Sequence, residues 1–242
     1  RVALVAAPAG YGKTTLVAAW GARQTDAADL RVAWLALAAD DNAPARFLRY
    51  LVAALQRAAP GLGERALAMV SAPEPVPPTA VLTALINDVA QAGEANVHTP
   101  LVLVLDDYHV LDRRAIHEAM TFLLNHMPPA LRVVIASRAD PPLPLHRWRA
   151  RRQLVEVRAA DLRFTGAETA AFLLASGVPT LAEAEIAALT ARTEGWPVGL
   201  QMAALSLREQ STPAEAHAFI QAFSGTQRYV LDYLLEEVVN RQ

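Results

Sequence analysis

The 242-residue sequence contains no cysteine, which excludes disulfide bonds, thiolate zinc sites and cysteine nucleophiles. It also has no uncharged apolar run close to the roughly 20 residues that a membrane-spanning helix needs. Its 22 basic and 24 acidic residues nearly balance, so no overall field favours nucleic acid or an anionic membrane. We therefore expect a cytoplasmic protein with no membrane partner.

Lysine is almost absent as well, because Lys13 is the only lysine among the 22 lysine and arginine residues. Lysine carries a compact charge on a flexible stem, whereas arginine is a broad planar fork. A narrow nest of backbone amides around a phosphate accommodates lysine better. The sequence also lacks an initiating methionine and stops at Gln242 within a predicted helix, so we expect a fragment of a longer protein.

Apolar runs bounded by turn residues predict five strands, and helical periodicity predicts helices between them. The strands are expected near residues 1–6, 31–37, 101–105, 132–136 and 154–157. The helices are expected near residues 13–25, 44–58, 79–92, 113–126 and 144–152, with a loop over 71–78. After about residue 160 only helices are predicted, near 166–176, 181–194, 197–209, 213–222 and 226–241. The alternation predicts an α/β fold whose parallel sheet is covered on both faces, followed by an all-helical region.

Residues 7–15 match a phosphate-binding loop between a strand and a helix, although Ala7 stands where the pattern usually has glycine. Backbone amides and the helix N-terminus would face one anion there. Lys13 would bridge the β- and γ-phosphates, and the Thr14 hydroxyl would bind Mg²⁺. The candidate nucleotide contacts are Ala9, Gly10, Tyr11, Gly12, Lys13, Thr14 and Thr15. The alternative is a strand-to-helix turn with an incidental lysine.

Asp106 and Asp107 directly follow the third predicted strand. Asp106 would hold Mg²⁺ through its hydration shell, and Asp107 would orient or deprotonate the attacking water. Because Asp107 is shorter than glutamate, we expect slow hydrolysis. Arg138 follows the fourth strand and would sense the γ-phosphate. The alternatives are that the acidic pair caps a helix and that Arg138 is a solvated surface charge.

Six strings of the sequence resemble the nucleotide-binding module of the MalT-type, large LuxR-type transcriptional regulators. They are residues 7–16, 106–109, 137–145, 161–165, 194–201 and 229–238, which follow the order of the family and cover nearly the whole chain. That family belongs to the STAND class, the signal-transduction ATPases with numerous domains. The resemblance implies the sheet order 5-1-4-3-2.

The resemblance also implies three domains and a second nucleotide contact. A P-loop nucleotide-binding domain would span residues 1–160, a helical lid 161–211, and the start of a truncated winged-helix domain 212–242. Pro197 matches the proline of a Gly-x-Pro motif that packs on the adenine in such proteins. The alternative for Pro197 is simply the first residue of a helix.

The function implied by the resemblance is an ATP-driven switch. ADP would hold a closed monomer, ATP with an inducer would promote self-association, and slow hydrolysis would reset the cycle, with Mg²⁺ as the metal. The inducer would bind downstream domains, and DNA would bind a C-terminal helix-turn-helix outside this sequence. The alternatives are a P-loop kinase or turnover ATPase, and a STAND switch with a non-transcriptional effector.

Two further features receive ordinary interpretations. His109 has no partner at a metal-ligand spacing, so a packing or capping role is expected. The basic run at residues 146–152 contains a tryptophan and could suggest binding of nucleic acid or of the phosphate of a bound nucleotide, but a solvated helix face is the preferred interpretation.

Overall fold

The computed structural model describes residues 1–27, 30–95, 100–210 and 212–223. The chain divides into two compact units. The first, which we call the sheet unit, comprises Arg1–Ala6 and Lys13–Val157. The second, the helical unit, comprises Ala7–Gly12 together with Arg158–Gln242. The first part of the predicted phosphate-binding loop therefore groups with the helical residues, while Lys13 and Thr14 belong to the sheet unit. The predicted domain limits stay a prediction.

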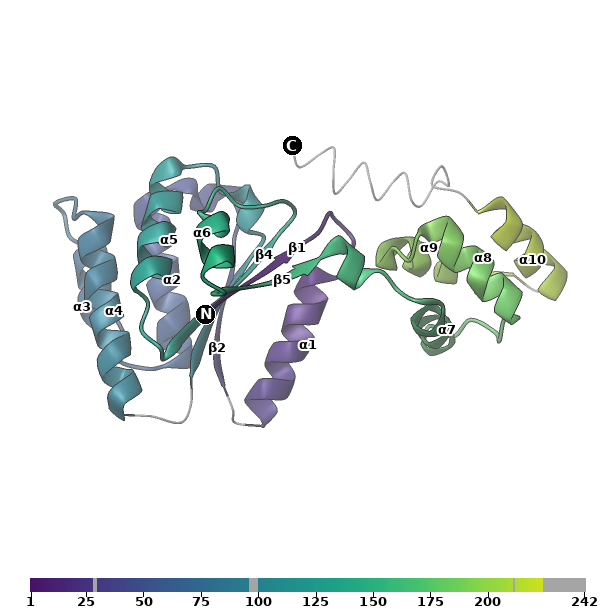
Figure 1. The fold of residues 1–242 in the computed structure, drawn as a ribbon, viewed down its shortest axis with the longest axis horizontal. Coiled ribbons are helices and arrows are strands. Elements are labelled where there is room, and N and C mark those ends of the chain that lie inside the picture. The colour runs from purple at the N-terminus through teal and green to yellow at the C-terminus, as the bar shows by residue number, and fades with distance from the viewer. Residues whose placement is uncertain (28–29, 96–99, 211, 224–242) are drawn as a thin grey trace. The chain divides into compact units, whose positions relative to one another are not determined.

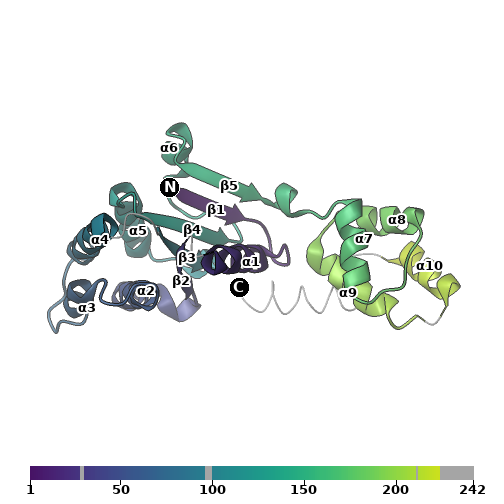
Figure 2. The same cartoon turned by 90° about the horizontal axis from the view of Figure 1, so that it is seen from below.

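The sheet has five parallel strands in the order β2-β3-β4-β1-β5 (Figure 2). The strands are β1 Val2–Ala6, β2 Arg31–Ala36, β3 Leu101–Asp106, β4 Leu131–Ser137 and β5 Leu154–Arg158. This arrangement confirms the predicted α/β fold and the order 5-1-4-3-2. In register, Ala6 of β1 lies opposite Ser137 of β4, and Leu105 of β3 lies opposite Ile135. The carboxyl ends of these strands thus share one edge of the sheet.

Helices cover both faces of the sheet, as predicted, with α1 on one face and α2, α4 and α5 on the other (Figure 1). The helices of this unit are α1 Lys13–Asp26, α2 Pro44–Ala58, α3 Glu64–Val70, α4 Pro78–Ala95, α5 Arg114–His126 and α6 Leu145–Ala150. Short 3₁₀ turns are η1 Ala39–Asn42 and η2 Tyr108–Val110. The larger core lies between the sheet and the helices of the second face, where Leu103, Leu105 and Met120 are fully buried.

The start of α4 and the presence of α3 differ from the sequence-based expectation. Pro78 begins α4 instead of ending the predicted loop, because proline lacks an amide hydrogen and fits the first turn of a helix. The short helix α3 was not predicted. It follows Gly63, which has φ +73°, and has only seven residues, too few to show a helical repeat.

The described helical unit contains 3₁₀ turn η3 and helices α7 to α10. Their bounds are η3 Ala159–Leu162, α7 Gly166–Ala175, α8 Glu183–Thr193, α9 Pro197–Leu207 and α10 Pro213–Ala222. Leu189, Leu200 and Ile220 are fully buried in the separate core of this unit. The predicted helix at 226–241, the motif at 229–238 and most of the predicted winged-helix segment lie outside the described residues. No helix in the described part of the chain is long and apolar enough to cross a membrane.

Candidate nucleotide-binding site

Thr14 and Asp106, the two predicted magnesium ligands, lie in direct contact in the sheet unit. The Thr14 hydroxyl, in the first turn of α1, donates a hydrogen bond of 3.1 Å to Oδ1 of Asp106 at the end of β3. The two residues are 92 positions apart in the chain. A hydroxyl and a carboxylate are the hard oxygen ligands that Mg²⁺ prefers. The pair therefore fits the metal that the sequence predicts.

Asp106 occupies a buried position at the sheet edge and is only 4% exposed. Burial raises the pKa of Asp106, while hydrogen bonds from Thr14 and from the Asp107 amide oppose that increase. Within the described ranges, no group of three or more His, Asp or Glu side chains can hold a metal ion. Phosphate oxygens and water would have to complete the coordination, as they do at magnesium-nucleotide sites.

Lys13 is buried beside charges of both signs, with 7% of its surface exposed. Burial is the largest influence on the pKa of Lys13, and it lowers that pKa. The negative charges of Asp107 and Asp106 raise this pKa, and the positive charge of Arg138 lowers it. These charge effects on Lys13 show that four residues predicted from separate motifs lie close together in the sheet unit. A phosphate group would add the negative charge that a buried ammonium favours.

Asp107 occupies the left-handed region of backbone space, with φ 55° and ψ 39°. Aspartate tolerates this conformation better than most residues. The turn is followed by Tyr108, which is fully buried and whose hydroxyl lies 3.0 Å from Nδ1 of His117 on α5. The Asp107 side chain stays 45% exposed. The buried tyrosine thus anchors a turn that leaves the carboxylate accessible.

His109 lies closer to the predicted catalytic group than the sequence suggested. Its Nδ1 is 3.8 Å from Oδ1 of Asp107. Burial lowers the pKa of His109, whereas the charge of Asp107 raises it. Its position two residues after Asp107 was the only sequence signal for this proximity.

Asn42 is a second residue that sequence reasoning did not identify. This residue ends η1, and its amide group donates to the Val110 carbonyl at 2.8 Å. Its Oδ1 accepts from the Asp112 amide at 2.8 Å. Asn42 thereby holds the loop that follows Asp107 and His109. No local pattern predicts the contact, because its partners are about 70 positions away in the sequence.

Ser137 and Arg138 stand at the end of β4. The Ser137 hydroxyl is completely buried and has no hydrogen-bond partner among the described residues. An unpaired buried hydroxyl is costly, so this oxygen suits a contact with a water or a bound group. Arg138 is half-buried, and its charge acts on Lys13 and on His109.

The remaining predicted contacts belong to the helical unit, except Thr15, which belongs to the sheet unit. Gly10 and Gly12 have φ values of +77° and +72°, a conformation that glycine adopts readily. Gly10 accepts a hydrogen bond of 3.2 Å at its carbonyl from the Val198 amide, in the first turn of α9. Pro197 begins that helix, so Pro197 and the loop lie together in this unit. Ala9, Tyr11 and Thr15 are all partly or well exposed.

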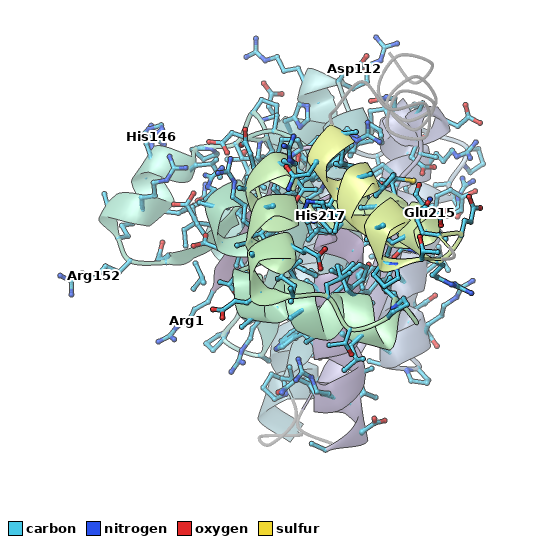
Figure 3. The ribbon with its side chains drawn as sticks, turned by 90° about the vertical axis from the view of Figure 1, so that its right-hand side faces the viewer. Arg1, Asp112, His146, Arg152, Glu215 and His217 are labelled. Carbon is cyan, nitrogen blue, oxygen red and sulfur yellow. The ribbon has the colours of Figure 1, made fainter. Side chains whose placement is uncertain are left out.

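The basic run at 146–152 lies on and just after α6. Leu145 and Trp148 are buried, while His146 and Arg152 are exposed at the surface (Figure 3). Arg149 pairs with Glu156 at 2.8 Å and with Asp140 at 3.4 Å. These contacts agree with the interpretation of this run as a solvated helix face.

Comparison with known families defines the class of this protein. The model of the AAA ATPase domain family matches residues 1–136, more than half of the chain. The chain therefore belongs to the AAA ATPase domain family.

Individual relatives match along the whole chain. The HTH-type transcriptional regulator MalT of Serratia proteamaculans is 36% identical over 241 residues, which are 99% of this chain and 25% of the relative. MalT of Yersinia enterocolitica is 36% identical over 242 residues, or 100% of this chain and 26% of the relative. These matches confirm the resemblance to MalT-type regulators. The chain spans about a quarter of the length of these two relatives.

Solved structures support the fold. The Drosophila ORC bound to DNA has a TM-score of 0.54 at 15% identity, over 99% of this chain and 62% of that chain. Cdc6p of Pyrobaculum aerophilum has a TM-score of 0.50 at 15% identity, over 91% of this chain and 56% of that chain. At this level of identity the likeness extends to the α/β fold alone.

Proposed function

We propose that this chain is the ATP-binding switch module of a MalT-like bacterial transcriptional regulator. The observation that carries the proposal is the 36% identity to MalT along the entire chain. DNA binding and inducer binding would reside in regions outside this sequence. The output of the module would be a change in self-association and not the product of the reaction.

In this proposal the phosphates of ATP bind the loop at residues 9–15. Lys13 would contact the β- and γ-phosphates, because its buried ammonium favours a nearby anion. Thr14 and Asp106 would hold Mg²⁺, and their direct hydrogen bond supports that assignment. When bound, Mg²⁺ would supply positive charge against the phosphate oxygens.

Hydrolysis would depend on Asp107 and Arg138. Asp107 would orient or deprotonate the attacking water, and its exposed carboxylate supports this role. Arg138 would sense the γ-phosphate. Nδ1 of His109, 3.8 Å from Oδ1 of Asp107, lies beyond direct hydrogen-bond distance, so a bridging water would have to link the two side chains. The short aspartate side chain leads us to expect slow turnover.

Pro197 would contact the adenine. Its position at the start of α9, one residue from the Val198 amide that bonds the loop, supports this role. A rigid apolar ring suits the face of a base. The helical unit would then respond to the identity of the bound nucleotide, with ADP favouring the closed monomer and ATP the associating state.

The first experiment measures nucleotide binding by thermal unfolding. Mg-ATP at about 100 times its dissociation constant should stabilise the chain by about 2.7 kcal/mol. For a chain of this size we expect a rise of about 5–11 °C in Tm. A chain whose Tm does not respond to any adenine nucleotide would contradict the proposal.

The second experiment separates a switch from a turnover enzyme. Single-turnover measurements on this chain should give slow cleavage of ATP, and Asp107→Asn should reduce it further without loss of ATP binding. Rapid cleavage by the parent chain would favour the turnover ATPase instead. In the complete regulator, sedimentation should show that ATP and inducer raise the oligomeric mass and that Lys13→Ala prevents the increase.

A further inference from the structure

The indole of Trp196 fits between two glycines of the helical unit. A Cβ atom added at Gly10 would lie 2.8 Å from Trp196 Nε1 and 2.9 Å from Val198 Cβ. A Cβ atom added at Gly199 would lie 2.9 Å from Trp196 Cε3. Real Cβ atoms do not come this close to other heavy atoms. Glycine at these two positions therefore lets the ring lie against both the loop and the first turn of α9.

Two donors at the start of α9 hold two successive carbonyls of the loop. Trp196 Nε1 donates to the Ala9 carbonyl at 3.2 Å. The Val198 amide donates to the Gly10 carbonyl, also at 3.2 Å. Both bonds lie within the helical unit, which contains the loop residues and α9. Pro197 stands between the two donors in the sequence.

Because the peptide bond is planar, these two hydrogen bonds also fix the direction in which the next amides of the loop point. In a trans peptide the carbonyl and the following amide hydrogen point in opposite directions, and no described peptide bond is cis. Holding the carbonyls of Ala9 and Gly10 therefore directs the amides of Gly10 and Tyr11 away from α9. Neither amide donates a hydrogen bond to a residue in the described part of the chain. Successive amides that point to one side form an anion-binding nest.

We propose that Trp196 is a positioning residue, whose N–H holds the loop in the form that presents the Gly10 and Tyr11 amides to the nucleotide phosphates. This inference rests on the proposed ATP-binding function. It adds that the loop is preorganised by the helical unit. A loop without this contact must lose more conformational freedom when the nucleotide binds, which weakens affinity.

The test compares two tryptophans that make the same kind of bond. Trp196→Phe keeps an aromatic ring but removes the N–H. Trp148→Phe removes a matched bond, because Trp148 Nε1 donates to Asn125 Oδ1 at 3.2 Å in the sheet unit. We expect Trp196→Phe to bind Mg-ADP and Mg-ATP about 2- to 12-fold more weakly, the range of one neutral hydrogen bond. Trp148→Phe should bind both nucleotides as the parent does.

Tryptophan fluorescence supplies a readout that a general loss of stability would not change. The four tryptophans of the chain include Trp196. Addition of Mg-ADP should alter the emission of the parent and of Trp148→Phe, and this change should be lost in Trp196→Phe. Equal nucleotide affinity in Trp196→Phe and the parent would overturn the inference, as would an unchanged emission response.

A double-mutant cycle without nucleotide tests the same contact from the loop side. Gly10→Ala should lower the Tm more than Gly12→Ala, because both glycines have positive φ but only Gly10 has close neighbours. The effect of Gly10→Ala should be smaller in the Trp196→Phe background, since the phenyl ring lacks two of the three crowding atoms. Additive effects would show that the indole does not press on the loop and would overturn the inference.

The outcomes also separate this inference from the proposed function. If the parent does not bind nucleotide, the proposed function fails and the positioning role fails with it. If the parent binds and Trp196→Phe binds equally well, only the positioning role fails.

Discussion

The sheet unit and the helical unit differ in the chemistry of their predicted nucleotide contacts. In the sheet unit the key groups are charged side chains that are nearly buried, with Lys13 7% exposed and Asp106 4% exposed. In the helical unit they are backbone carbonyls, backbone amides and the neutral indole of Trp196. Charge and pH should therefore govern the first group, while shape and backbone direction govern the second.

The two units also differ in what their predicted nucleotide contacts cost the stability of the chain before nucleotide binds. Burial lowers the pKa of Lys13 and raises the pKa of Asp106, so burial disfavours the charged form of each side chain. A bound anion and a bound cation would relieve these costs. The helical unit carries no such cost at the loop, because its described contacts there are neutral hydrogen bonds.

The largest effect is expected for Lys13→Ala. Loss of the ammonium should remove nearly all of the rise of about 5–11 °C that saturating Mg-ATP produces in the parent. The matched control is Arg23→Ala, which removes an exposed positive charge near the end of the same helix. A full nucleotide-dependent rise in Lys13→Ala would show that the charge of Lys13 does not govern nucleotide binding.

The second effect concerns Asp106→Asn and the metal. The amide preserves the size of the side chain but removes its charge, so we expect the ATP-bound chain to bind Mg²⁺ about 10- to 100-fold more weakly. Titration of Mg²⁺ at constant ATP measures this affinity. Asp112→Asn is the control, since Asp112 is 79% exposed and lies a few residues further along the chain. Equal metal dependence in Asp106→Asn and the parent would rule out Asp106 as a ligand.

A third effect should appear in Asp106→Asn without nucleotide. Because the folded-state pKa of Asp106 is raised, its ionised form destabilises the folded chain at pH values above that pKa. We expect Asp106→Asn to exceed the parent by up to about 2 kcal/mol in free energy of unfolding near neutral pH.

This difference should shrink as the pH falls through the raised pKa and vanish below the ordinary value of 3.8, where the carboxyl is protonated in both states. Denaturant unfolding over that range of pH provides the measurement. A difference that grows towards low pH would contradict the sign of the pKa shift. The stability difference between Trp196→Phe and the parent should not vary with pH in this way.

The smallest effect is expected for Tyr108→Phe. The substitution removes a buried hydroxyl and leaves Nδ1 of His117 without that partner, at a cost of about 1 kcal/mol. Tyr50→Phe is the control, because Tyr50 is 41% exposed. Thermal unfolding of both variants gives the comparison. A cost for Tyr108→Phe no larger than that of the control would mean that this bond does not anchor the turn at Asp107.

Much of the fold could be predicted because the relevant signals are local. The buried runs of β3 and β4 lack polar alternation, and Lys13 follows a strand and precedes a helix. The contacts of the site are not local. Trp196 and Ala9 lie 187 positions apart, so no spacing rule connects them. Asn42 also gains its partners, Val110 and Asp112, only when separate segments fold together.

Neighbouring residues were enough to predict the parallel α/β sheet, the phosphate loop and the residues at the carboxyl ends of the strands, because strand periodicity and short motifs are local patterns. That residues 7–12 pack with the helical unit and that Trp196 bonds the Ala9 carbonyl became visible only in the folded chain. A hydrogen bond forms between atoms that are close in space. Packing brings such atoms together regardless of their separation along the chain.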